Sequence, residues 1–207
     1  MPPQPTVTPT APAHLHSLLK DATAPAHDRL EQTLALLREP FSKRRLVAVL
    51  RGFAAFHAGW EPALAASMED EAFTAPRRRA AWAADDLRVL GAEADAASVD
   101  AWPEAPALCR TRDAALGSLY VMEGSTLGGK VIAARLARAS WWPAAGLRYF
   151  SPHGGSAAAM WRQTLARIER DAVTPEAVVQ GALATFELLQ QRLGALLPSA
   201  APAAAAA

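Results

Sequence analysis

The sequence has a single cysteine, Cys109, among 207 residues. One cysteine excludes a disulfide framework and a thiolate metal cluster within the chain. Neither sign of charge is in excess, because 21 lysines and arginines face 20 aspartates and glutamates. A net charge of +1 gives no electrostatic footprint for nucleic acid, so we expect no nucleic-acid partner. The short basic run at residues 77–79 is interpreted as a solvated helix start after Pro76.

Long apolar runs are missing as well. No stretch of about 18 uncharged apolar residues occurs, so we expect no membrane span. The N-terminus reads M-P-P-Q-P-T-V-T-P-T-A-P and lacks the basic and apolar regions of a secretory signal, which predicts a cytoplasmic protein. Residues 1–12 are rich in proline and threonine, and residues 198–207 are rich in alanine, so both tails are expected to be disordered.

The alternating pattern of β-strands is also missing. Apolar residues recur instead at three- and four-residue spacing, which is typical of amphipathic helices. Pro62 is expected to kink or end the second helix. We predict an all-α protein of about six to eight helices, with one domain at residues 13–197. Four of the expected helices cover 14–37, 42–68, 130–139 and 153–171. Two more start at Pro76 and at Pro106, and the second of these runs through Tyr120. The last is capped by Thr174-Pro175-Glu176 and runs to Leu197.

One segment carries three glycines within six residues. Residues 119–131 read L-Y-V-M-E-G-S-T-L-G-G-K-V. The run G-S-T-L-G-G-K fits a phosphate-binding loop up to its lysine, but Val131 stands where that loop needs a serine or threonine for magnesium. Each glycine inside a helix costs about 1 kcal/mol relative to alanine. Two alternatives remain, a helix broken by a glycine turn and a kinked helix whose backbone lies against a flat ligand.

A second candidate lies on the first expected helix. His27 stands four residues before Glu31 and seven after Lys20, so all three share one helix face. Imidazole is a common iron ligand, and a carboxylate one turn away can hold its other nitrogen. The alternative is a histidine at the boundary of the core with no ligand. The remaining histidines are weaker candidates, among them His57 in an aromatic stretch and His153 in an expected loop.

Together, two stretches resemble the heme oxygenase family, and more closely its bacterial members that supply biliverdin to phytochromes. They are L-K-D-A-T-A-P-A-H-D-R-L-E at 19–31 and L-Y-V-M-E-G-S-T-L-G-G at 119–129. A third similarity is Y-F-S-P-H-G-G…M-W-R-Q-T-L within 149–165. The resemblance implies a single helical domain that holds heme between a proximal and a distal helix.

The resemblance implies roles for residues on the proximal side. His27 would be the axial ligand of the heme iron, and Glu31 would lie near its imidazole. Lys20 matches a basic position that meets a heme propionate. Arg162 is expected to contact a propionate as well, and Tyr120 is expected to face the pocket.

On the distal side, the resemblance implies that Gly124, Gly128 and Gly129 place backbone over the heme face. Ser125 stands where animal-type members carry an aspartate that organises distal water, as in the phytochrome-associated subgroup. A serine can hold water but supplies no carboxylate. Glu123 is a neighbouring carboxylate in the sequence.

The implied reaction is cleavage of heme with O₂ and external reductant to biliverdin, carbon monoxide and ferrous iron. The chain has no flavin or nicotinamide fingerprint and no Fe–S cysteines, so an external reductase or ferredoxin is the implied donor, and a bacteriophytochrome the implied recipient of biliverdin. A non-catalytic heme carrier or sensor is the alternative, supported by the missing distal aspartate. A third alternative is a protein of the same fold that acts on another substrate. Di-iron proteins of this kind need Glu-x-x-His pairs on facing helices, and the sequence has no such pair.

Overall fold

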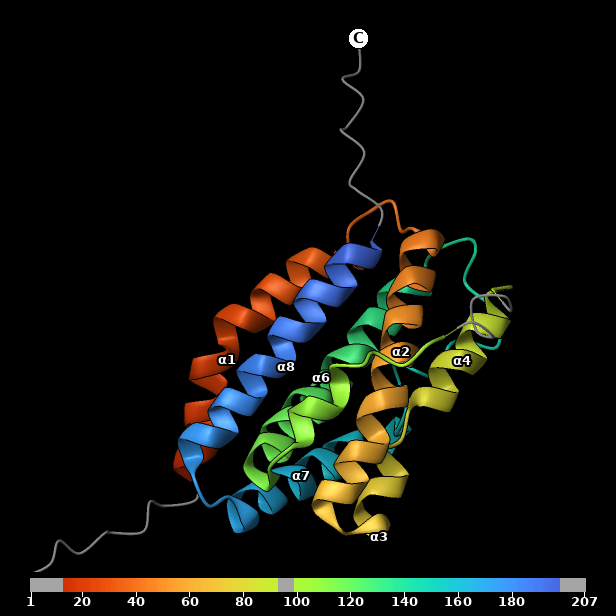
Figure 1. Ribbon diagram of the computed structural model, residues 1–207. Helices are drawn as coiled ribbons and strands as arrows, with labels where there is room; N and C mark the ends of the chain where they lie inside the picture. Colours follow the sequence, from red (N-terminus) through yellow and green to blue (C-terminus); the bar gives the residue numbers. More distant parts are fainter. Residues whose placement is uncertain (1–12, 93–98, 198–207) are drawn as a thin grey trace, which may run out of the picture.

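The computed structural model describes residues 13–92 and 99–197 (Figure 1). Those residues contain helices and turns but no β-strand, so the predicted all-α class is confirmed. The two tails expected to be disordered, 1–12 and 198–207, lie outside them. None of the helices described is both long and apolar enough to cross a lipid bilayer. The elements are α1 (Ala13–Leu34), α2 (Lys43–Met68), α3 (Glu71–Thr74), η1 (Ala75–Arg77), α4 (Ala80–Val89), η2 (Ala105–Cys109), α6 (Arg112–Leu136), η3 (Gly154–Ser156), α7 (Ala157–Asp171) and α8 (Pro175–Leu196), where η marks a 3-10 helix.

Three long helices, α1, α8 and α6, run in the same direction, with α8 between the other two (Figure 1). Glycines bring α6 and α8 close together. A Cβ atom on Gly117 would lie 2.0 Å from the carbonyl oxygen of Val178, and one on Gly181 would lie 2.5 Å from that of Ala114. Only glycine fits at such distances, so this crossing is fixed by two residues without side chains. Because α8 also packs along α1, it holds the two helices that carry all of the expected site residues except Arg162 of α7.

The second helix packs against the other side of α6. The Trp60 indole donates a hydrogen bond of 2.7 Å to Ser118 Oγ, and both side chains are buried. Pro62 does not end α2, which continues to Met68. Of the two outcomes expected for this proline, a helix end is therefore wrong. Leu64 and Met68, beyond the proline, are buried, and their packing outweighs the backbone hydrogen bond that proline removes.

Two other prolines begin 3-10 helices instead of the expected α-helices. Pro76 lies in η1 and Pro106 in η2, while α4 and α6 begin later in the chain. Proline fits the first turn of either helix type because the N–H it lacks has no intrahelical partner there. The first α-helix also ends earlier than expected, since Ala35 has a left-handed backbone with φ of 43°.

The start of α8 differs from its expected cap. Thr174 occupies the N-cap position but makes no side-chain cap hydrogen bond. The carboxylate of Asp113 from α6 accepts hydrogen bonds from the backbone N–H groups of Val173 and Thr174 instead, each at 2.9 Å. Asp113 thus fixes the two residues just before α8 to the start of α6, while the helix start itself has no side-chain cap.

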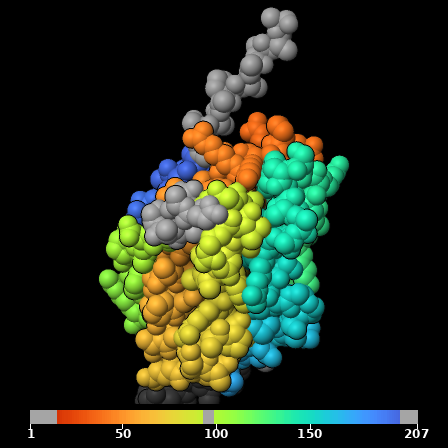
Figure 2. Space-filling view, turned by 90° about the vertical axis from the view of Figure 1, so that its right-hand side faces the viewer, coloured from red at the N-terminus to blue at the C-terminus, as the bar shows by residue number. Residues whose placement is uncertain are grey.

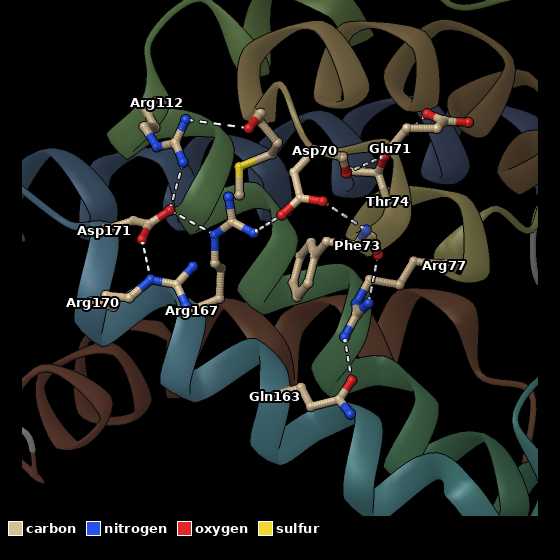
Figure 3. A network of polar contacts seen from close by, with 11 residues as sticks. Asp70, Glu71, Phe73, Thr74, Arg77, Arg112, Gln163, Arg167, Arg170 and Asp171 are labelled. Atoms are coloured by element: carbon tan, nitrogen blue, oxygen red, sulfur yellow. Dashed lines mark hydrogen bonds and ion pairs between the residues drawn. The ribbon is translucent and has the colours of Figure 1, made fainter.

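A carboxylate shared by three arginines ties several helix ends together (Figure 3). Asp171 at the end of α7 accepts hydrogen bonds from Arg112 and Arg167 at 2.6 Å and from Arg170 at 2.8 Å. Arg167 also pairs with Asp70 at 2.5 Å. Burial alone would raise the pKa of Asp171, but the arginines hold it well below its usual range. This cluster joins the start of α6, the end of α7 and the corner between α2 and α3.

On another face of the molecule, α4 lies beside the segment 137–156 (Figure 2). Asp86 of α4 is buried and accepts hydrogen bonds from the backbone N–H groups of Arg148 (2.9 Å) and Tyr149 (2.7 Å). Burial raises the pKa of Asp86, and those two hydrogen bonds oppose the rise. Asp86 therefore anchors the loop that carries Tyr149 and Phe150.

Candidate functional site

His27 lies on an exposed face of α1 beside two carboxylates. Its side chain is 54% exposed, with Nε2 3.7 Å from Glu31 Oε1 and Nδ1 3.8 Å from Asp28 Oδ1. The ring also packs edge-on against Phe186 of α8, with 6.0 Å between ring centroids. The structure thus brings together the predicted pair of His27 and Glu31. An exposed imidazole with a carboxylate near each nitrogen can present one nitrogen to a metal while the other is held.

Tyr120 sets the register between α1 and α6. Its hydroxyl is hydrogen-bonded to Thr23 of α1, and burial raises its pKa. Both helices run in the same direction (Figure 1), so each continues past this contact toward the same end of the bundle. His27 is one turn after Thr23, and Gly124 is one turn after Tyr120. His27 and Gly124 thus lie one turn beyond the same interhelical contact, toward the same end of the bundle.

The three residues expected to contact the propionates or line the pocket lie around one aromatic cluster. The ring centroid of Tyr120 is 5.3 Å from that of Trp161 and 6.2 Å from that of His16. Lys20 is exposed and lies one turn after His16 on α1, while Arg162 is exposed and follows Trp161 on α7. Two cationic side chains thus begin within one turn of the cluster.

The glycine segment does not break its helix. α6 is continuous from Arg112 to Leu136, so the glycine-turn alternative is wrong, as is an end of the helix near Tyr120. The three glycines face different surroundings. A Cβ on Gly124 would make an ordinary 3.5 Å contact with the Trp161 ring, whereas one on Gly129 would lie 2.2 Å from the carbonyl oxygen of Phe150. Gly129 thus has a packing reason of its own, and its place over a heme stays a prediction.

Gly128 lies on an open face of α6. A Cβ at this position would meet no heavy atom of the described residues within 4 Å. Its neighbours on the helix surface, Leu127 and Val131, are 42% and 56% exposed. Glycine in open space inside a helix costs about 1 kcal/mol relative to alanine, so the fold gives no reason for it. An apolar surface with a glycine at its centre suits close approach by a flat apolar ligand.

The basic run at 77–79 is not a solvated helix start, so that interpretation is wrong. Arg77 and Arg79 are buried, and only Arg78 is exposed. Arg77 donates a 2.6 Å hydrogen bond to the Phe73 carbonyl, and its Nε lies 3.4 Å from Glu123 Oε2. Composition could not reveal this arrangement, because a carboxylate that faces Arg77 comes from a helix far along the chain.

Ser125 joins the open face of α6 to the buried Arg79. Ser125 is exposed, but its Oγ donates a 2.7 Å hydrogen bond to the Met122 carbonyl and accepts a long one, 3.4 Å, from Arg79 Nη1. Arg79 Nη2 donates to the same carbonyl at 2.6 Å. Glu123, the neighbouring carboxylate in the sequence, is 1% exposed and faces Arg77. Burial raises the pKa of Glu123, and the two arginines oppose the rise.

A buried row of polar groups continues from Arg79 away from α6. The backbone N–H of Arg79 donates to Glu61 Oε1 at 2.5 Å, and the same oxygen lies 3.1 Å from His57 Nδ1. His57 Nε2 lies 3.0 Å from the Tyr149 hydroxyl. Burial lowers the pKa of His57 to about 4, so its ring is neutral at pH 7. Sequence reasoning gave His57 little weight because its polar partners come from other turns and another segment.

Comparison with known proteins gives consistent matches. A sequence model of the family described as heme oxygenase matches residues 13–194. A curated protein named heme oxygenase from Xanthomonas campestris pv. campestris (strain 8004) is 37% identical over 113 residues, which are 53% of this chain and 64% of that protein. The chain thus matches less than two thirds of that relative's length. The crystal structure of NO- and CO-bound heme oxygenase from Neisseria meningitidis shares the fold, with a TM-score of 0.67, 22% identity, and coverage of 93% of this chain and 98% of the other.

Proposed function

The chain belongs to the heme oxygenase family, and we propose that it cleaves heme with O₂ and external reductant to biliverdin, carbon monoxide and ferrous iron. An external reductase or ferredoxin would supply the electrons. We also propose that the biliverdin serves a bacteriophytochrome, on the likeness of the segment around Ser125 to the phytochrome-associated subgroup. Support for the proposal comes from the arrangement of two helices.

The observation that carries the proposal is the pairing of an exposed histidine with an open glycine face. His27 on α1 and Gly124 on α6 each lie one turn beyond the contact between Thr23 and Tyr120, and both helices run in the same direction (Figure 1). Gly128, one turn further, is flanked by exposed apolar side chains, and a Cβ there would touch no heavy atom of the described residues within 4 Å. A metal ligand on one helix and a side-chain-free apolar surface on another together fit a planar ligand with a central metal.

The residues of α1 and its surroundings would hold the substrate. One imidazole nitrogen of His27 would bind the iron, and the carboxylate of Glu31 would orient the ring and raise its basicity. The cationic side chains of Lys20 and Arg162 would meet the two propionates. The half-buried hydroxyl of Tyr120 would line the same end of the site.

The distal helix would leave room where the reaction occurs. Heme, when bound, supplies the iron that activates O₂ and the carbon that is oxidised. The missing side chain at Gly128 would keep that space open, Gly124 would let the Trp161 ring lie close to the helix, and Leu127 and Val131 would exclude bulk water. Ser125 would be the polar group at its edge, and the buried Arg79 lies behind it with Nη1 3.4 Å from Ser125 Oγ.

Hemin titration followed by a single turnover tests the proposal. We expect one hemin to bind per chain with a Soret band, and reductant in air to convert it to biliverdin. His27→Ala should lose the axial-ligand spectrum, and added imidazole should restore it, while the exposed Gln32→Ala on the same helix should behave as wild type. Hemin that is bound but survives reductant and O₂ would indicate a carrier or sensor. No hemin binding would exclude both functions and favour another substrate.

A further inference from the structure

Arg79 is an unusual residue for the interior of a helical bundle. It is 2% exposed, and its guanidinium lies under the turn of α6 that contains Met122 and Ser125. The guanidinium also lies over the Tyr149 ring, with Cζ 5.5 Å from the ring centroid. A buried arginine is retained only where its hydrogen bonds and charge have partners. Its position therefore needs an explanation beyond packing.

The hydrogen bonds around Ser125 fix the polarity of its hydroxyl. A hydroxyl has one hydrogen to donate and two lone pairs to accept with. The hydrogen of Ser125 goes to the Met122 carbonyl at 2.7 Å, and one lone pair faces Arg79 Nη1 at 3.4 Å. One lone pair remains without a partner among the described residues, and Ser125 is an exposed residue. At the open face of α6, Ser125 is thus an acceptor only, as a carboxylate is.

Charged groups surround Arg79 on several sides. Glu61 accepts from its backbone N–H, and the electrostatic influence of Arg79 reaches Glu123 and the neutral His57. Arg77 adds a second buried cation, which faces Glu123. Among the described residues, no hydrogen-bond partner is present for Arg79 Nε. Buried polar atoms of this kind are usually satisfied by ordered water.

We propose that Arg79 is a positioning residue of the distal face, which fixes Ser125 Oγ as an acceptor that orients water on the open side of α6. This inference rests on the proposed function. A water that donates one O–H to Ser125 directs its other hydrogen or its lone pairs into the space beside Gly128. The buried positive charge of Arg79 favours loss of a proton from that water over gain of one.

The first test needs no heme. A double-mutant cycle of Arg79→Met and Ser125→Ala in urea unfolding of the apoprotein measures whether the two side chains interact. We expect the double variant to lose less stability than the sum of the two single losses, because each single change removes the same contact. Additive losses would overturn the proposal, since Arg79 would then act on something other than Ser125.

The second test follows the acid–alkaline transition of the ferric hemin complex by visible absorption. Arg79→Met should move the midpoint of this transition to higher pH by on the order of one unit. The reason is that a buried positive charge, which favours the deprotonated form of water on the distal face, is lost. Arg79→Lys keeps the charge, so its midpoint should lie close to that of the wild type. If Arg79→Met does not fold, Arg79→Lys still allows the measurement. Arg77→Met is the matched control, a buried arginine of the same segment that contacts Glu123 and not Ser125.

The outcomes separate the two proposals. An equal shift in Arg77→Met and Arg79→Met, or no rescue by lysine, would overturn the role of Arg79 and leave heme cleavage standing. A wild-type protein that binds no hemin would overturn the proposed function, and the distal role with it, while the apoprotein cycle would still report the contact between Arg79 and Ser125. A selective shift with lysine rescue and non-additive stabilities supports the proposal.

Discussion

Replacing Gly128 with alanine should stabilise the apoprotein and weaken hemin binding at the same time. The new Cβ would meet no heavy atom of the described residues within 4 Å, so it introduces no clash. Alanine in place of glycine inside a helix gains about 1 kcal/mol. For a chain of this size, such a gain raises Tm by about 2–4 °C.

The same methyl group would occupy the space that the proposal gives to the substrate. It would hold a flat ligand away from the helix backbone, so hemin affinity should fall by about tenfold, which corresponds to about 1.4 kcal/mol. Biliverdin formation in a single turnover should slow as well. Urea unfolding of the apoprotein and hemin titration by absorbance measure the two effects on one preparation.

Gly129→Ala is the matched control one residue further along α6. Its Cβ would lie 2.2 Å from the Phe150 carbonyl oxygen and 3.0 Å from the carbonyl carbon, both backbone atoms that cannot rotate away. We expect a loss of about 1–3 kcal/mol from this overpacking. If Gly128→Ala were also destabilising, the face would not be open. If it were stabilising but bound and cleaved hemin as wild type does, Gly128 would not face the substrate.

Two further predictions concern the contribution of Asp171 and His57 to the unfolding free energy and its dependence on pH. Asp171→Asn should cost roughly 1–3 kcal/mol of unfolding free energy, because Arg112 and Arg167 lose their hydrogen bonds to a shared charged carboxylate. The pKa of Asp171 is depressed in the folded state, so its contribution to the unfolding free energy is present above about pH 4 and lost as the pH falls further. Below about pH 4 the unfolding free energy of Asp171→Asn should therefore decline less steeply than that of the wild type. An equally steep decline in both proteins would contradict the assignment. His57 titrates at about 4 when folded and at about 6.5 when unfolded, so wild-type stability should fall by on the order of 3 kcal/mol as the pH drops across that window. His57→Gln should remove this loss, and urea titrations at pH 7 and pH 4 check it.

Local sequence patterns predicted the elements whose cause is local. The helix expected over 42–68 is found as α2, and it begins there for a local reason, since the Ser42 side chain accepts from the Arg45 N–H. His27 and Glu31 meet because a four-residue spacing places them on one helix face. The helical class follows from apolar periodicity for the same reason. Each of these statements needs only residues within a turn or two of one another.

Features that depend on distant residues were not predictable in this way. The basic run at 77–79 suggested a solvated surface, yet Arg79 is buried because Met122 and Ser125 lie 43 and 46 positions away and accept its hydrogen bonds. The N–H groups before α8 are satisfied by Asp113, which is 60 and 61 positions away. No pattern within a short window shows such pairings, since the fold alone brings these groups together.

The glycine segment of α6 combines three physical reasons that one motif cannot separate. Gly129 lets the loop at Phe150 approach the helix, and Gly124 accepts the edge of an aromatic cluster at ordinary distance. An added Cβ would clash at neither Gly124 nor Gly128, so the folded chain would gain from alanine at both, and at Gly128 it would also touch no heavy atom of the described residues within 4 Å. A residue that makes its own helix less stable, without any packing benefit, is best explained by a ligand that occupies the space. For this reason stability measurements on the apoprotein, made without heme, bear directly on where heme binds.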